Sequence, residues 1–167
     1  VGNGEVVSDV RTVSGFSGVE VSNSVQARIT VNPAAPTLVE LTVDAESNLV
    51  ELVQTEVTGE TLDARSVGEV MPTEPIIVSG MVPSIDDIRA SNSGDARVDG
   101  VDVPVLEVRA RNSSFVAVRG VADELRLDLD NSARANLEDL TVVDAEIVLT
   151  NSASASICAS GTVTGRV

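Results

Sequence analysis

Residues 88–98 read IRASNSGDARV, and related stretches recur along the second half of the chain. The Asn-Ser pair that begins at Asn92 returns at Asn112, Asn131 and Asn151, with spacings of 20, 19 and 20 residues. Around each pair, apolar or small residues alternate with mostly polar ones. A strict period of two over about a dozen residues predicts extended strands with one buried face. In the first copy, the positions expected to point inward are Ile88, Ala90, Asn92, Gly94, Ala96 and Val98.

The repeat also predicts how these strands are arranged. Each copy continues through turn signals such as Asp99-Gly100 into another short apolar run. Stacked units of about 20 residues are typical of a parallel β-helix, whose coils lie about 4.8 Å apart. A fifth copy covers residues 19–31, whereas residues 32–83 lack the repeat and contain five prolines. We therefore predict one all-β domain over residues 1–167: a first coil at 19–31, an irregular β segment at 32–83 and four regular coils at 84–164.

Stacking predicts which outward-facing charges become neighbours. Side chains at equivalent positions of successive coils lie side by side, so opposite charges are expected to face one another. Each exposed ion pair contributes only about 0.2–1 kcal/mol, so these pairs test the register more than they explain the stability. The expected neighbours are Arg109 with Asp128, Arg111 with Asp130, and a ladder of Asp99, Arg119 and Glu138.

The repeated asparagines are the candidate structural site. With Asn92, Asn112, Asn131 and Asn151 pointing inward, their amides would form a ladder in which each hydrogen-bonds to the next. Asn112-Ser113-Ser114 also matches a glycosylation sequon, but an inward Asn112 makes that reading weak.

Composition excludes several classes of function. The 167 residues include no His, and all 11 basic residues are Arg, so His-dependent catalysis, His-ligated metals and P-loops are ruled out. A net charge of −15 disfavours binding to nucleic acid or anionic membranes. Since 43% of the residues are hydrophobic, the chain can still bury a sizeable core. No stretch is long and apolar enough to span a bilayer.

Two sets of charged residues keep an enzymatic alternative open. A Ca²⁺-dependent polysaccharide-processing enzyme would use Asp clusters to hold the cation and an Arg as base. The interpretation that we favour is that these charges form solvated ladders on the sheet surface. The candidates are Asp95, Asp99 and Asp102 with Arg97, and Asp128 and Asp130 with Arg126.

Two single residues are candidate surface contacts. Phe115, one of only two aromatic residues, takes an outward position, where it either packs under a loop of the irregular segment or contacts a partner. Cys158 is the only cysteine and lies in an outward row, Val148 to Cys158, that carries no charge. An uncharged row in so acidic a chain fits either a neutral serine-rich face or contact with another chain.

The opening of the chain and its repeats resemble a known bacterial family. Gly2-Asn3-Gly4, followed by RTVSGF at 11–16, is similar to the start of the head GIN domain, and Ala90–Asp95 resembles its Ser-Gly-rich repeat. The resemblance implies a right-handed parallel β-helix on the extracytoplasmic side, described as the head of an autotransporter adhesin, with no established activity. It supplies no functional residue.

We therefore expect a non-enzymatic binding or adhesion module at the cell surface or in the periplasm. Its signal or anchor would lie outside this sequence. Expected partners are a surface polymer or a protein, without nucleic acid, membrane insertion or a cofactor, and we predict no catalytic, cofactor-binding or metal-binding residue. The alternative is a structural scaffold that self-associates through the ends of the β-helix, whose strand edges remain open for pairing.

Overall fold

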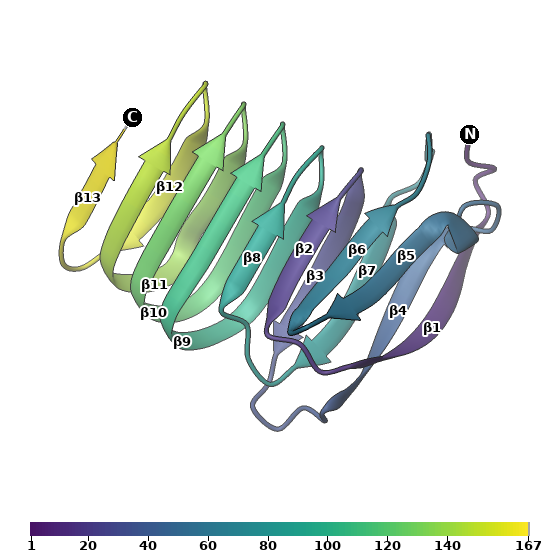
Figure 1. Cartoon of the computed structure of the whole chain (residues 1–167), viewed down its shortest axis with the longest axis horizontal. Coiled ribbons are helices and arrows are strands. Elements are labelled where there is room, and N and C mark those ends of the chain that lie inside the picture. The colour runs from purple at the N-terminus through teal and green to yellow at the C-terminus, as the bar shows by residue number, and fades with distance from the viewer. Residues whose placement is uncertain (167) are drawn as a thin grey trace.

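The computed structural model describes residues 1–166 and is built almost entirely of β-strands (Figure 1). One 3₁₀ turn, η1, interrupts them, and strands β9, β10 and β11 are much longer than the others. The elements are β1 (Val6–Ser14), β2 (Gly18–Ser22), β3 (Val25–Val31), β4 (Leu38–Glu46), η1 (Val50–Leu52), β5 (Val53–Thr58), β6 (Thr61–Ser66), β7 (Ile76–Val82), β8 (Asp87–Ala90), β9 (Asp95–Arg111), β10 (Phe115–Asp130), β11 (Arg134–Leu149), β12 (Ser154–Ala159) and β13 (Val163–Arg166).

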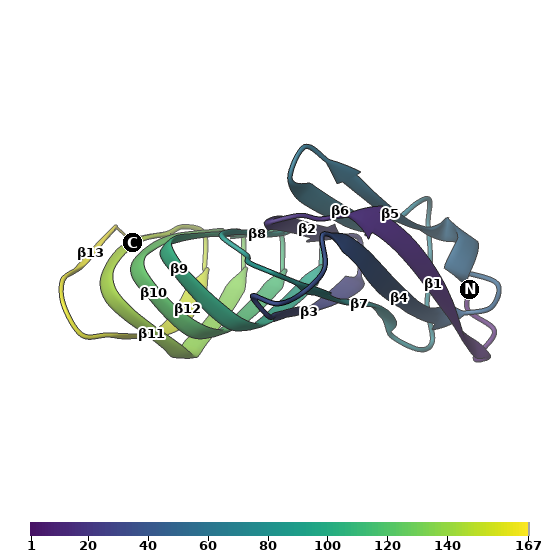
Figure 2. The same ribbon diagram turned by 90° about the horizontal axis from the view of Figure 1, so that it is seen from below.

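The prediction of a parallel β-helix as the fold class is wrong. The strands form one mixed sheet of 13 strands, in which nine follow the path β1-β4-β7-β3-β9-β8-β2-β6-β5 and curl into a nearly closed, barrel-like arrangement. The pairs β1–β4, β4–β7 and β5–β6 are antiparallel, whereas β8, β9, β10 and β11 pair in parallel. Figure 2 shows β1 and β4 side by side at the end of the molecule that holds the N-terminus.

The physical reason for this difference lies in what a repeat can specify. A period of two decides which face of a strand is buried, but not the direction of the strand beside it. Within the irregular segment 32–83, the two-residue turn Gly59-Glu60 closes β5 and β6 into a hairpin, and β4 returns beside β1. The segment therefore adds antiparallel strands to the sheet.

The inward-facing positions were predicted correctly, apart from the asparagines. Ile88, Ala90, Ala96 and Val98 are all buried, and Gly94 is buried as well. The core continues through the equivalent residues of neighbouring strands, among them Val19, Val108, Val116, Leu127 and Leu137. At the last copy, Ile157 packs only partly against this core because β12 has a neighbouring strand on one side only.

The long strands change register where they bend. In the pairing of β10 with β9, Arg119 faces Asp99 but Gly120 faces Val101, so one residue of β9 is left over. Gly120 has φ +137°, and a Cβ atom there would lie 2.1 Å from the carbonyl oxygen of Val101. Only glycine allows this close approach.

Candidate binding surface

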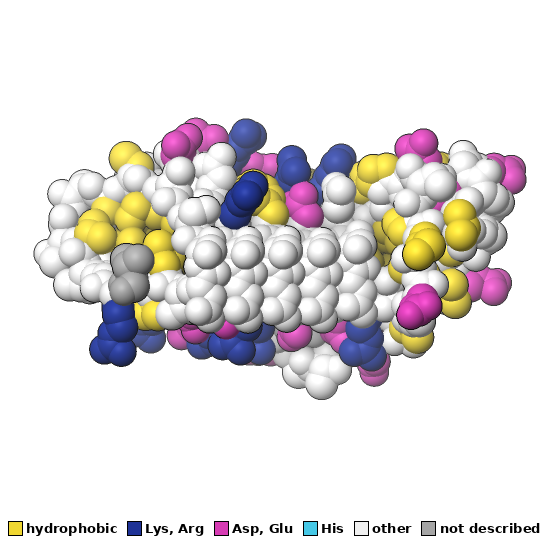
Figure 3. All heavy atoms as spheres, turned by 90° about the horizontal axis from the view of Figure 1, so that it is seen from above, with side chains coloured by type: hydrophobic (Ala, Val, Ile, Leu, Met, Phe, Trp, Pro, Cys, Tyr) yellow, Lys and Arg dark blue, Asp and Glu magenta, His cyan; other side chains and the backbone are white. Residues whose placement is uncertain are grey.

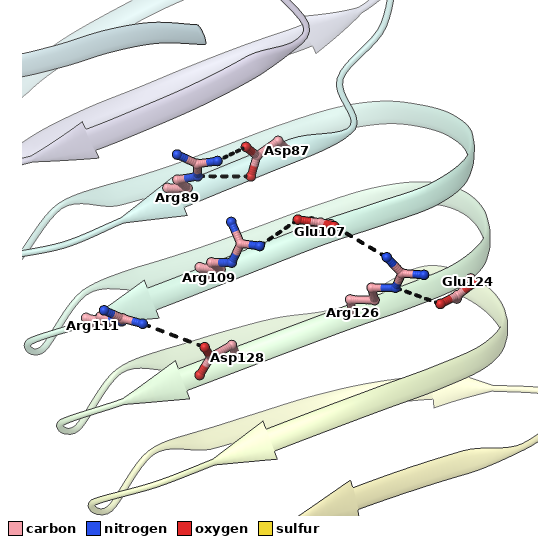
Figure 4. A network of polar contacts seen from close by, with 8 residues as sticks. All are labelled: Asp87, Arg89, Glu107, Arg109, Arg111, Glu124, Arg126 and Asp128. Atoms are coloured by element: carbon pink, nitrogen blue, oxygen red, sulfur yellow. Dashed lines mark hydrogen bonds and ion pairs between the residues drawn. The ribbon is translucent and has the colours of Figure 1, made fainter.

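Charged side chains cover the outer face of β8, β9 and β10, and most pair along their own strand (Figure 4). An acid and an Arg two residues apart point to the same side of a strand, so they can meet without a partner strand. Six such pairs have N–O distances of 2.5–2.9 Å: Asp9–Arg11, Asp63–Arg65, Asp87–Arg89, Asp95–Arg97, Glu107–Arg109 and Glu124–Arg126.

The predicted register between strands is confirmed, but the contacts differ from the predicted ladders. Arg109 lies opposite Asp128 and Arg111 opposite Asp130. Arg109 nevertheless binds Glu107, and the nearest acid to Arg111 is Asp128, at 3.7 Å.

The three-step ladder is correct only in its first step. Arg119 lies opposite Asp99, 3.7 Å away, but its closer partner on the next strand is Asp139 at 3.1 Å, not Glu138.

Pairing along the strands leaves like charges opposite one another across the strands. Arg89 faces Arg109, and Asp87 faces Glu107. The surface beside the two guanidinium groups is hollowed, with a volume of about 330 Å³, and Arg111 lies on its rim. Glu20, Ala90 and Ser91 complete the lining.

The asparagines lie in the turns between strands and not inside the molecule. All four predicted ladder residues are exposed, so the inward orientation is wrong. Each Asn and the Ser after it have positive φ, 48–56° and 60–66°, as do Asn23 and Ser24. Two successive residues with positive φ form a tight type I′ turn, which takes both side chains out of the alternating pattern. Figure 3 looks onto this row of turns, which carries no charge.

Neighbouring turns are joined by two sets of hydrogen bonds. The amide of Asn112 donates to Asn92 Oδ1 at 3.0 Å, and Asn131 donates to Asn112 Oδ1 at 3.2 Å. The backbone N–H of Ser93 donates to the Asn112 carbonyl, and Ser113 and Ser132 do the same to the next turn. Asn151 differs, because its amide donates to Asp130 Oδ1 at 2.8 Å. Hydrogen bonds from Thr150 and Asn151 lower the pKa of Asp130 below its ordinary value.

The two other predicted surface residues lie on strands. Phe115 is half-buried at the start of β10, where the guanidinium carbon of Arg97 lies 5.6 Å from its ring centroid. No loop of the irregular segment is needed to explain its position, because a cation–π contact already covers part of the ring. Cys158 is exposed on β12 with a free thiol. The contact roles of both residues stay predictions.

The acidic residues considered for Ca²⁺ are spread over the surface. Asp95 pairs with Arg97, and Asp128 lies nearest to Arg111. Within residues 1–166, no group of three His, Cys, Asp or Glu side chains is arranged to hold a metal ion.

The most buried acid, Glu46, holds the N-terminal segment in place. Its carboxylate accepts hydrogen bonds from the N–H of Gly4 and from the N–H and hydroxyl of Thr73, at 2.5–2.9 Å. These bonds, the hydroxyl bond first among them, lower the pKa of Glu46 to about 2. A carboxylate whose oxygens are all engaged in this way serves the fold and not a reaction.

The family model described as "Putative auto-transporter adhesin, head GIN domain" matches residues 15–167. The chain belongs to the head GIN domain family. The family resemblance of this head GIN domain is thus confirmed over residues 15–167, which include the repeats but not the opening Gly2-Asn3-Gly4. No curated protein matches the chain.

Solved structures share the fold of this head GIN domain at low sequence identity. A crystal structure of a "putative adhesin" from Parabacteroides distasonis has a TM-score of 0.63 and 18% identity, covering 98% of this chain and 80% of that one. A "putative adhesin" from Parabacteroides merdae gives 0.61 and 15%, covering 98% and 81%. A "putative lipid binding protein" from P. distasonis gives 0.58 and 14%, covering 98% and 95%. Within residues 1–166, no helix is long and apolar enough to cross a membrane.

The sequence analysis did not predict that Arg89 lines a hollow, or that acidic and Arg side chains pair along single strands. The signal was present as the spacing acid-x-Arg, which occurs six times among the ion pairs above. The 20-residue spacing does place Arg89 opposite Arg109, but the hollow itself had no sequence signal, because it depends on how side chains from β2, β8 and β9 pack together.

Proposed function

We propose that this head GIN domain is a non-enzymatic, adhesion-type module that binds a surface polymer through the outer face of β8, β9 and β10. The observation that carries the proposal is the row of Arg side chains held by acids on a rigid sheet (Figure 4). Guanidinium groups fixed in this way present donors to a ligand at little entropic cost. The names of two related structures, both called adhesins, support the same class.

A place at the cell surface or in the periplasm fits this function. The family description refers to autotransporter adhesins, which act outside the cytoplasm. We do not propose that this face catalyses a reaction on a bound glycan, because its carboxylates form ion pairs with Arg side chains.

Native affinity electrophoresis through a panel of polysaccharides, with and without Ca²⁺, tests the binding function. We expect at least one polymer to retard the protein without Ca²⁺. Unchanged mobility on every polymer would contradict the proposal. A strict need for Ca²⁺ would instead favour a metal site among the surface carboxylates.

The open edge of the sheet supports a second candidate, assembly into a scaffold. Within residues 1–166, β12 pairs only with β11, and its sequence SASICA contains none of the charges or prolines that usually protect an edge strand. Apolar side chains gather at this end of the molecule (Figure 3). A second chain could add a strand here.

Sedimentation velocity over a range of protein concentrations distinguishes the two candidates. A scaffold would assemble as concentration rises, and its Cys158 would become less reactive towards a bulky thiol reagent. A constant monomer with a reactive thiol would leave the binding module as the better explanation.

A further inference from the structure

We infer that the hollow bounded by Arg89, Arg109 and Arg111 binds a single oxyanion, a carboxylate or sulfate group, of an acidic glycan. This inference rests on the proposed function and names the ligand chemistry of that surface. The site lies where β8 runs beside β9, between the Asn-Ser turns and the bend of the long strands.

The register of the strands brings two positive charges together without an acid between them. Arg89 on β8 lies directly opposite Arg109 on β9, while Glu20 on β2 lies opposite Arg89 on its other side and also lines the hollow. Adjacent strands are about 4.8 Å apart, so two guanidinium groups in these positions repel each other. An oxyanion in the hollow of about 330 Å³ beside them would relieve this repulsion.

Two of the three Arg side chains have donors to spare. Arg109 uses Nη2 to bind Glu107 at 2.7 Å and makes no other side-chain hydrogen bond to the described residues. Arg111 makes none, and with 58% of its side chain exposed it stands 3.7 Å from Asp128. A guanidinium group has five N–H donors in a planar fork that matches the two oxygens of a carboxylate or sulfate.

The surrounding acids orient the Arg side chains, and they add hydrogen-bond acceptors beside the oxyanion site. Asp87 binds Arg89 through Nη2 at 2.5 Å and through Nε at 3.3 Å, so this guanidinium is held in one orientation. The same acids could accept hydrogen bonds from sugar hydroxyls beside the oxyanion.

The charge around the hollow also favours a glycan over nucleic acid as the ligand. The eight residues drawn in Figure 4 are four Arg and four acids, and Glu20 in the lining of the hollow makes a fifth acid, so the patch is nearly balanced on a chain of net charge −15. A densely charged polymer would be repelled by the rest of the surface, whereas one isolated oxyanion can approach the hollow.

The test is affinity electrophoresis of the full chain through three polymers: dextran carrying sparse carboxymethyl groups, dextran carrying sparse sulfate groups, and uncharged dextran. Arg109→Ala, Arg111→Ala and Arg111→Lys are compared with Arg28→Ala, which removes the same charge from exposed Arg28 on β3. We expect the sparsely carboxymethylated or the sparsely sulfated dextran, but not uncharged dextran, to retard the wild type. The alanine variants at 109 and 111 should bind about tenfold more weakly, with Arg111→Lys in between, because a charge-assisted bond contributes about 1.5 kcal/mol.

Each outcome decides a different point. Whichever of the two anionic polymers binds identifies the group as carboxylate or sulfate. Equal retardation by uncharged dextran, or an equal loss in Arg28→Ala, would overturn the anion site while the binding function stands. Binding to neither charged dextran would overturn this site. The proposed function would stand if another polysaccharide of the panel retarded the protein, and would fall with the site if none did. Far-UV circular dichroism verifies that each variant is folded.

Discussion

Asn and Ser in the repeated turns adopt a backbone conformation that most residues avoid. Positive φ costs a residue with a Cβ atom about 1–2 kcal/mol, and Asn tolerates it better than most because its side chain can hydrogen-bond locally. In this structure the side chain of Asn112 also bonds to both neighbouring turns. Conformation and hydrogen bonding therefore both favour Asn at this position.

Substitutions at Asn112 separate these two contributions. Asn112→Ala should lower the free energy of unfolding by about 2 kcal/mol, because it loses the bonds and places alanine at φ 56°. Asn112→Gly loses the bonds but accepts the conformation, so we expect a loss below about 1 kcal/mol. Urea denaturation measures both. Equal losses would show that hydrogen bonding, not backbone conformation, selects Asn here.

Glu46 is expected to make stability depend on pH. Its pKa is about 2 in the folded protein, below its ordinary value of 4.5. The stabilisation is therefore complete above about pH 5 and is lost as the pH falls towards 2. We expect Glu46→Gln to be less stable than the wild type at pH 7, with a difference that shrinks steadily towards pH 2.

Urea denaturation between pH 2 and 7 measures this difference. Exposed Glu69 provides the control, since Glu69→Gln should leave the profile unchanged. A gap between the wild type and Glu46→Gln that stayed constant over the whole range would contradict the assignment.

At the scale of elements, the bend of β10 depends on one glycine. Gly120 has φ +137° and lies against the backbone of Val101, which cannot move aside as a flexible side chain could. Both pairings of β10 shift register next to this residue. The bend and the shift therefore require glycine at this position.

Gly120→Ala should destabilise the protein by more than about 3 kcal/mol, or prevent folding. Gly59→Ala is the matched control: Gly59 also has positive φ, +64°, but a Cβ atom there meets nothing within 4 Å. We expect it to cost only about 1 kcal/mol. Thermal and urea denaturation of the two variants give the comparison. Similar losses would mean that the contact with Val101 is easily relieved.

For the whole molecule, the net charge of −15 opposes compaction. Added salt screens this repulsion, and it weakens the exposed ion pairs as well, but unpaired acids outnumber them. We expect NaCl between about 10 and 300 mM to raise stability by on the order of 1 kcal/mol, or roughly 2–4 °C in Tm. Calorimetry measures the shift, and sucrose at equal osmolality is the uncharged control. A falling Tm would show that the ion pairs dominate.

The sequence by itself determined the buried face and the register of the repeated strands, and the family. Alternation and spacing are local, so they can be read without knowing the partner strand. Tertiary structure decided the rest. The antiparallel strands of segment 32–83 turned the predicted β-helix into a mixed sheet, and positive φ placed the asparagines outside. The hollow near Arg89 depends on the packing of side chains from β2, β8 and β9, which no local pattern specifies.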